Sequence, residues 1–106
     1  MANNDLSKKV AVVTGGADGI GEGITRTLWG HGAQVVIADI QEEKGAGLAT
    51  ELGENVSFFP LDVTDPGNWV ALITELKNTA GRLDILVNNA GGGGFGNLDQ
   101  LTFEEW

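Results

Sequence analysis

The chain has 106 residues, and its 15 Asp and Glu residues against 6 Lys and Arg give a formal net charge of −9 at pH 7. Its length and its 42% apolar share fit one domain with a single core and no second domain. The lack of Cys and the single His exclude thiolate and multi-histidine metal sites, and the lack of Tyr excludes a phenolic general acid. The acidic excess disfavours nucleic acid and anionic membrane surfaces as partners.

Targeting signals are not evident in the sequence. No apolar stretch precedes Lys8 and Lys9, and no apolar run is long enough for a membrane span. We therefore expect no membrane association, and the lack of Cys favours a cytoplasmic location.

Four short apolar runs, mostly of β-branched residues, are each followed by turn or cap residues and predict strands. Apolarity that is continuous, not alternating, is typical of parallel strands that are buried on both faces. The expected strands are Val10–Val13, Val35–Ala38, Val56–Phe59 and Ile85–Val87.

The segments between these runs are long enough for crossover helices. Ile20, Ile24 and Leu28 recur at the spacing of one helical face, which predicts the first helix. The second stripe is weaker because it contains two glycines, and the third helix has an N-cap and a proline start signal. The three helices are expected over about Gly19–His31, Gly45–Leu52 and Asp65–Gly81.

This alternation of strands and helices predicts an α/β fold. Right-handed crossovers carry the first three strands in one direction, and the third helix then returns the chain so that strand four lies beside strand one. We predict a Rossmann-like, doubly wound parallel sheet that is truncated after about four strands, with the order 3-2-1-4. A flavodoxin-like order is the alternative, and both orders place the ligand-binding switch point beside strand one.

A glycine-rich segment, Thr14–Gly21, joins the first strand to the first helix. Backbone N–H groups and the positive end of a helix can bind a pyrophosphate at such a turn. Gly15 permits the tight turn, and Gly19 lets a ligand approach the backbone. Gly21 with Gly23 is expected to let the helix lie close to the sheet. An ordinary strand-to-helix turn is the alternative interpretation.

Asp39 ends the second strand and follows Gly21 by 39 − 21 = 18 residues, which is close to the offset of about 20 in dinucleotide-binding folds. A carboxylate there accepts hydrogen bonds from the ribose hydroxyls of adenosine and repels a 2′-phosphate. Neither Asp18 nor residues 40–43 offers the cation that NADP would need. We therefore predict NAD in preference to NADP; the alternative is a solvated acid at a strand end.

Two further strand ends carry candidate residues. Asp62 could accept from an adenine amino group while Val63 packs or bonds through its backbone, although an N-cap or an Asx turn also explains Asp62. Asn88 and Asn89 end the fourth strand and would face the phosphate loop at the switch point. Such side chains tie neighbouring strands or hold the ribose of the cofactor, and for Asn88 we favour strand-end hydrogen bonding.

Together these residues resemble the short-chain dehydrogenase/reductase family. Its patterns T-G-x-x-x-G-x-G and N-N-A-G are unbroken at Thr14–Gly21 and Asn88–Gly91, and Asp62-Val63, Asp65-Pro66 and Gly81–Asp84 also match. The resemblance implies a Rossmann-like fold, a nicotinamide dinucleotide and hydride transfer between an alcohol and a carbonyl. It implies that nine residues touch the cofactor: Gly15, Asp18, Gly19, Ile20, Gly21, Asp39, Asp62, Val63 and Asn89.

The second half of the family's pattern is missing from this chain. The resemblance assigns catalysis to a Ser, a Tyr-x-x-x-Lys pair and a further Asn in that half, and the Tyr transfers the substrate proton. We therefore expect the NAD-binding part of an oxidoreductase, with no catalytic residue of its own and a small alcohol or carbonyl substrate only in a complete chain. A stand-alone NAD-binding, regulatory or interaction module without catalysis is the alternative.

The last residues predict another helix, because Thr102–Glu105 has the spacing of a capping box. A chain that ends there would leave the strand Ile85–Val87 at the edge of the sheet and one sheet face short of helices. We therefore expect the isolated chain to self-associate, to aggregate or to be loosely folded.

Overall fold

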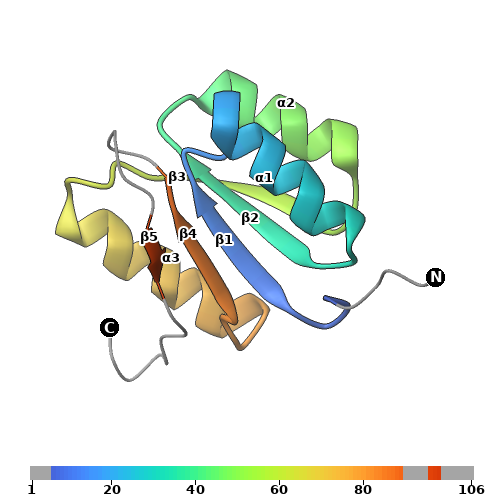
Figure 1. Ribbon diagram of the computed structural model, residues 1–106. Coiled ribbons are helices and arrows are strands. Elements are labelled where there is room, and N and C mark those ends of the chain that lie inside the picture. The colour runs from blue at the N-terminus through green and yellow to red at the C-terminus, as the bar shows by residue number, and fades with distance from the viewer. Residues whose placement is uncertain (1–5, 90–95, 99–106) are drawn as a thin grey trace.

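The computed structural model describes residues 6–89 and 96–98, which form one sheet and three helices (Figure 1). The expected helix at Thr102–Glu105 lies outside the described residues. The strands are β1 (Val10–Thr14), β2 (Gln34–Asp39), β3 (Val56–Pro60), β4 (Ile85–Asn88) and β5 (Gly96–Leu98), and the helices are α1 (Gly19–Gly30), α2 (Glu42–Leu52) and α3 (Pro66–Thr79).

The sheet has the order β3-β2-β1-β4-β5. The pairs β2–β3, β1–β2 and β1–β4 are parallel, so the predicted order 3-2-1-4 is confirmed and the flavodoxin-like order is wrong. β2 and β3 lie on one side of β1 and β4 lies on the other, so the order of the strands reverses beside β1 and the switch point lies at the carboxyl ends of β1 and β4.

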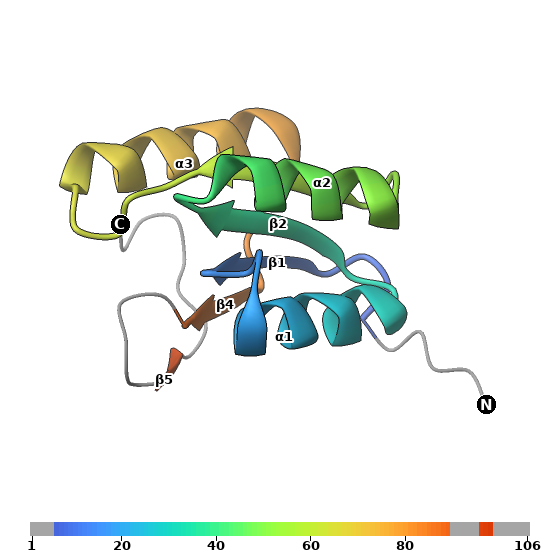
Figure 2. The same ribbon diagram turned by 90° about the horizontal axis from the view of Figure 1, so that it is seen from above.

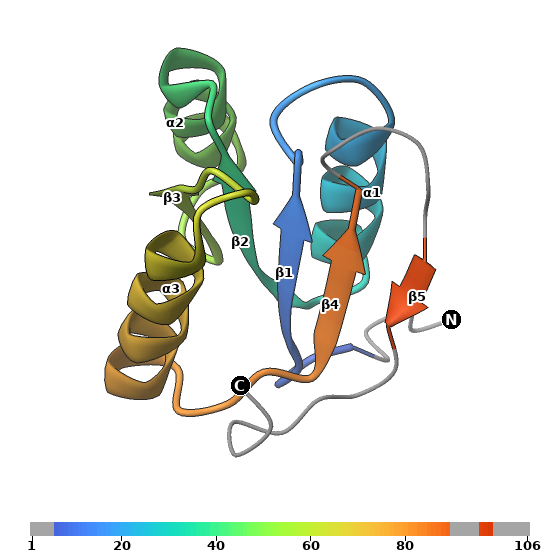
Figure 3. The ribbon, with the colours of Figure 1, turned by 90° about the vertical axis from the view of Figure 1, so that its left-hand side faces the viewer.

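The expectation that strand four forms the edge of the sheet is wrong. β5 pairs antiparallel with residues Leu86–Asn88 of β4, and Figure 3 shows it running beside β4 in the opposite direction. β5 was not predicted because its sequence, Gly96-Asn97-Leu98, has neither an apolar run nor β-branched residues. A strand this short depends on its backbone pairing with β4 more than on the β-propensity of its own residues. Self-association of the chain remains a prediction.

The two faces of the sheet bury alternate residues of the same strands. Val13, Val35 and Ile37 pack in one cluster with residues of α1 and α2, whereas Val12 and Val36 pack in a second cluster with residues of α3. Figure 2 shows α1 and α3 on opposite sides of β1 and β4. Continuous apolarity in β1 and β2 is thus explained by helices on both faces.

β3 does not follow the same rule. Its Phe58 and Phe59 are only half-buried and Ser57 is exposed, although three of the four residues of the expected strand Val56–Phe59 are apolar. The reason is its position, because β3 is the outermost strand beside β2 and the helices cover it incompletely.

Helices α1 and α3 both begin at an aspartate cap, of which only that of α3 was predicted from the sequence. The carboxylate of Asp18 accepts from the backbone N–H of Gly19, and Asp65 accepts from Gly67 while Pro66 occupies the first turn of α3. Both caps fix where the chain leaves the carboxyl edge of the sheet, which is the edge that carries the candidate site.

Candidate functional site

The turn between β1 and α1 has the backbone geometry that its glycines suggest. Gly15 and Gly19 have φ angles of 67° and 57°, in the left-handed region that side chains disfavour. The N–H of Gly15 donates to the carbonyl of Ala38 at 2.7 Å, which holds the turn against the end of β2. A Cβ atom built on Gly19 meets no atom within 4 Å, so this side of the turn is open to a ligand.

Gly21 and Gly23 differ, and the role expected for Gly23 is wrong. A Cβ atom on Gly21 would overlap the carbonyl oxygen of Gly15 and lie 2.8 Å from Nδ2 of Asn89. A Cβ atom on Gly23 would meet nothing within 4 Å, and Gly23 is exposed. Gly21 therefore allows α1 to pack against the turn itself, whereas Gly23 plays no part in the approach of the helix to the sheet.

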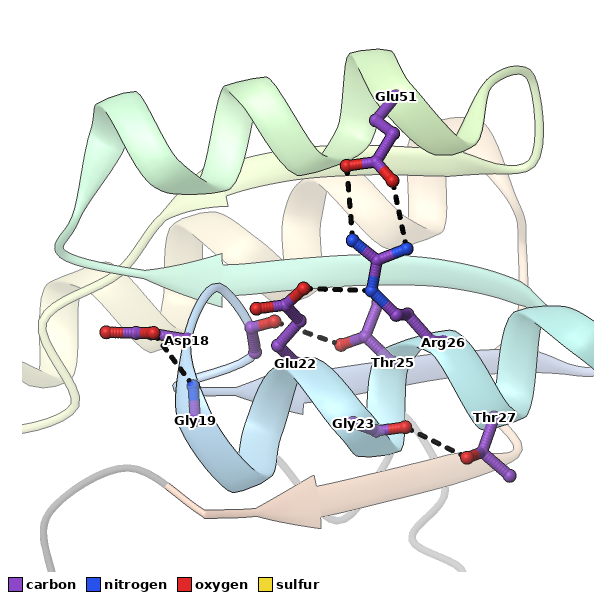
Figure 4. Close-up of polar contacts among 9 residues, drawn as sticks. Asp18, Gly19, Glu22, Gly23, Thr25, Arg26, Thr27 and Glu51 are labelled. Atoms are coloured by element: carbon purple, nitrogen blue, oxygen red, sulfur yellow. Dashed lines mark hydrogen bonds and ion pairs between the residues drawn. The ribbon is translucent and has the colours of Figure 1, made fainter.

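Asp18 joins the turn to α2 as well as capping α1. Its Oδ1 accepts from Gly19 N at 2.9 Å, the bond drawn in Figure 4, and its Oδ2 lies 2.8 Å from Nζ of Lys44. The hydrogen bond from Lys44 and then that from Gly19 lower the pKa of Asp18, and the bond to Asp18 raises the pKa of Lys44. Lys44 was not among the predicted site residues, because it lies one residue beyond residues 40–43, which contain no cation.

Asp39 is fixed between the turn and the start of α2. Its Oδ2 accepts from the backbone N–H of Ala17 at 3.1 Å, and its Oδ1 accepts from that of Gln41 at 2.9 Å. Only 6% of the residue's surface is exposed, so a solvated strand-end acid does not describe it. The contact with Ala17 places the carboxylate of Asp39 directly beside the glycine turn.

Asp62, in the loop after β3, forms the Asx turn that the sequence left open as an alternative to adenine binding. Its Oδ1 accepts from the backbone N–H and the hydroxyl of Thr64, at 2.9 and 2.6 Å, which is an Asx turn. These bonds lower the pKa of Asp62. Val63 is half-buried and packs against the cluster under α3, and its carbonyl accepts from Nε1 of Trp69. Contact of either residue with an adenine ring stays a prediction.

The end of β4 is tied to the end of β1. The hydroxyl of Thr14, which is fully buried, lies 3.2 Å from Oδ1 of Asn88 and accepts from the backbone N–H of Asn89 at 2.9 Å. Nδ2 of Asn89 donates to the carbonyl of Gly15 at 3.3 Å. Strand-end hydrogen bonding by Asn88 is thus confirmed, and Asn89 faces the glycine turn. The sequence places Thr14 only at the start of the glycine motif, whereas in the structure its side chain connects the ends of β1 and β4.

Arg26 joins α1 to α2 through two carboxylates (Figure 4). Its Nε lies 2.8 Å from Glu22, one turn earlier in α1, and its two terminal nitrogens lie 3.0 and 3.1 Å from Glu51 of α2. These bonds lower the pKa of Glu51 and raise that of Arg26. The guanidinium is therefore committed to the packing of the two helices and is not presented to a ligand.

Most predicted site residues gather at one end of the sheet. Carboxyl ends of parallel strands meet at the same edge, and the hydrogen bonds Ala17–Asp39 and Gly15–Asn89 connect the ends of β1, β2 and β4. Ile20 projects from the first turn of α1 and is 68% exposed. The loop with Asp62 and Val63 follows β3 at this same edge.

Two further observations are confined to residues 6–89 and 96–98. No three His, Cys, Asp or Glu side chains come together there as a possible metal site. No helix in that part is sufficiently long and apolar for a membrane span.

An open, mostly parallel sheet with helices on both faces and a glycine turn at its switch point defines the Rossmann-like class. Comparison with known proteins then identifies the family, because the family model for short chain dehydrogenase matches residues 9–106. The chain belongs to the short-chain dehydrogenase family.

Individual relatives support the same assignment. The chain is 44% identical over 88 residues to 3-beta-hydroxysteroid dehydrogenase of Comamonas testosteroni, covering 83% of this chain and 35% of the relative. It is 40% identical over 101 residues to 3-alpha-(or 20-beta)-hydroxysteroid dehydrogenase of Mycobacterium tuberculosis, covering 95% and 39%. With (+)-borneol dehydrogenase 1 of Salvia officinalis the identity is 48% over 86 residues, covering 81% and 33%. The matched part is thus 33% to 39% of the length of these relatives.

Proposed function

We propose that this chain binds a nicotinamide dinucleotide and forms the cofactor-binding part of an oxidoreductase that interconverts an alcohol and a carbonyl. The observation that carries the proposal is the glycine turn, held between the carboxylate of Asp39 and the side chain of Asn89. Relatives named for steroid and borneol oxidation differ in substrate but are all dehydrogenases of alcohols. The proposal is therefore made at the level of the reaction, without a particular substrate.

The residues present fit such a cofactor. The open side of Gly19 leaves room for a phosphate to approach the backbone, since a Cβ atom there meets nothing within 4 Å. Negative charge is stabilised at the start of α1 by the backbone N–H groups and the dipole of the helix. Gly15 and Gly21 keep the turn compact beneath that position. When bound, the nicotinamide supplies the atom that gives or takes the hydride.

Asp39 would bind the adenosine ribose and favour NAD over NADP. A carboxylate has about four acceptor sites, and backbone N–H groups occupy one on each oxygen of Asp39. The remaining acceptor sites can take hydrogen bonds from ribose hydroxyls, whereas a 2′-phosphate would bring its negative charge against a carboxylate that cannot swing away. This assignment is supported by the burial of Asp39 and by its contact with the turn.

The 106-residue chain is proposed to bind without turnover. It contains no Tyr, and the family resemblance assigns the transfer of the substrate proton to a Tyr. Its single His is at the end of α1, where Nδ1 of His31 lies 2.9 Å from the carbonyl of Thr27. Substrate binding and proton transfer would therefore depend on residues that this chain does not have.

Titration with NADH, followed by its fluorescence and by calorimetry, tests the proposal. We expect saturable binding by the parent chain and a loss of about tenfold or more in affinity for Asp39→Ala, because charge-assisted hydrogen bonds to the ribose disappear. Asp84→Ala is the matched control, since Asp84 also accepts from a backbone N–H but lies at the start of β4, the opposite end of the sheet. Circular dichroism would verify that both variants are folded.

The two possible failures are separable. A parent chain that does not bind NADH contradicts the proposed function. Equal NADH affinity in the parent and Asp39→Ala contradicts only the assignment of the ribose to Asp39.

A further inference from the structure

Lys44 is the cation that the fold places beside the carboxylates of the candidate site. It lies in the first turn of α2, and an open cavity of about 470 Å³ is lined by Ile40–Lys44 directly after Asp39. The other five Lys and Arg residues lie elsewhere: Lys8 and Lys9 before β1, Arg26 paired with Glu22 and Glu51, Lys77 in the last turn of α3, and Arg82 paired with Asp84 before β4.

A short chain of contacts connects Lys44 to Asp39 through the glycine turn. Nζ of Lys44 lies 2.8 Å from Oδ2 of Asp18, and the neighbouring residue Ala17 donates its N–H to Asp39 at 3.1 Å. The negative charges of Asp39 and Glu22 also raise the pKa of Lys44, after the larger effect of Asp18. The ammonium group is thus within the electrostatic reach of the residue proposed to select the ribose.

The ion pair is accessible and can rearrange. The side chains of Lys44 and Asp18 are 56% and 53% exposed, and a lysine ammonium on its flexible stem can redirect its hydrogen bonds to a phosphate. Exposed pairs of this kind are weak, so a ligand phosphate could compete for the lysine. Asp18 opposes that transfer in two ways, because a phosphate must displace its hydrogen bond to the ammonium and because its own negative charge repels an anion.

We propose that Asp18 withholds Lys44 from the 2′-phosphate of NADP, so that the ion pair acts with Asp39 to set cofactor selectivity. The inference rests on the proposed function, because it concerns which dinucleotide the same site accepts. Lys44 would be a latent phosphate ligand, and Asp18 would be the residue that keeps it latent. Removing the charge of Asp18 would then favour NADPH more than NADH.

Asp18 has a second possible effect, which the experiment must separate. Its carboxylate caps α1 and lies at the end of the helix that would face the pyrophosphate, so its negative charge could weaken both cofactors equally. In that case the loss of the charge would tighten NADH and NADPH by the same factor. The ratio of the two dissociation constants, and not either constant alone, reports on Lys44.

Dissociation constants for NADH and NADPH would be measured for the parent, Asp18→Asn, Lys44→Gln and the double variant. Asparagine is as good an N-cap as aspartate, so Asp18→Asn removes the charge and keeps the cap. We expect Asp18→Asn to change the ratio of the two dissociation constants in favour of NADPH by about five- to tenfold, the strength of one new charge-assisted bond. Adding Lys44→Gln in the double variant should abolish this change. Glu43→Gln is the control for bulk charge, since Glu43 adjoins Lys44 in α2.

Three results would overturn the inference. They are an unchanged ratio in Asp18→Asn, with or without equal tightening of both cofactors, a shift that survives in the double variant, and an equal shift in Glu43→Gln. If the parent binds neither cofactor, the proposed function fails and the inference with it. If the parent binds NADH while the ratio stays constant, only the inference fails.

Discussion

Replacing Gly21 by alanine tests whether close packing in the turn is what requires glycine there. The added methyl group would overlap the carbonyl oxygen of Gly15, lie 2.7 Å from its carbonyl carbon and lie 2.8 Å from Nδ2 of Asn89. Two of these three atoms belong to the backbone, so no side-chain rotation relieves the overlap. The turn or the first turn of α1 must shift, and the hydrogen bond between Asn89 and Gly15 would shift with it.

The size of the effect follows from two opposing contributions. Overpacking of a rigid site costs typically up to about 3 kcal/mol, while alanine gains at most about 1 kcal/mol over glycine in a helix. The net expectation is a loss of about 2 kcal/mol in the free energy of unfolding, or about 10 °C in melting temperature for a domain of this size. Gly23→Ala is the matched control in the same helix, and it should be stabilised by up to about 1 kcal/mol because its methyl group meets nothing.

Urea unfolding and thermal melting, both followed by circular dichroism at one protein concentration, would measure the pair. NADH titration of the folded variants would show whether the shifted turn also loses affinity, as we expect for Gly21→Ala and not for Gly23→Ala. The reasoning is refuted if Gly21→Ala is as stable as the parent, or if Gly23→Ala is the less stable of the two.

Two further substitutions test other contacts of the fold. The guanidinium of Arg82 lowers the pKa of Asp84, so Asp84 contributes stability above its unfolded pKa that is lost as the pH falls through its folded pKa. The stability difference between the parent and Asp84→Asn, about 1 to 2 kcal/mol at pH 7, should therefore shrink below pH 4 in urea titrations; a constant difference would contradict this. Gly45→Ala should destabilise the chain by about 1 to 3 kcal/mol, because its methyl group would overlap the ring of Phe58. The added Phe58→Leu should recover part of that loss, and strictly additive effects of the two changes would count against the contact.

The fold was predictable because most strands coincide with short apolar runs that can be recognised in the sequence. The run Val10–Val13 is one residue shorter than β1, and Ile85–Val87 is one residue shorter than β4. Continuous apolarity located the strands wherever helices cover both faces, but it misstated the burial of β3, since burial depends on position in the sheet. β5 could not be predicted in this way, because it forms by backbone pairing with β4 and not from an apolar run of its own.

The candidate site was predictable where it depends on the backbone and not where it depends on packing between helices. Gly15, Gly19 and Asp39 follow from the spacing of residues along the chain, since the turn and the end of β2 are fixed by local sequence. The pair of Asp18 and Lys44 joins residues 26 positions apart, and it forms only because α1 and α2 pack side by side on one face. Spacing cannot report such a contact.

If the proposed dinucleotide binds, this acidic chain must attract the anionic cofactor with something other than its net charge of −9. The cations of α1 and α2 are already engaged, Arg26 with two glutamates and Lys44 with Asp18. The remaining attraction comes from the N–H groups and dipole at the start of α1, which act only on a group in close contact with the backbone. Affinity should then depend mainly on the geometry of the glycine turn, and selectivity on the few charges around it. This division explains why the glycine substitutions and the substitutions of the ion pair test different properties of one site.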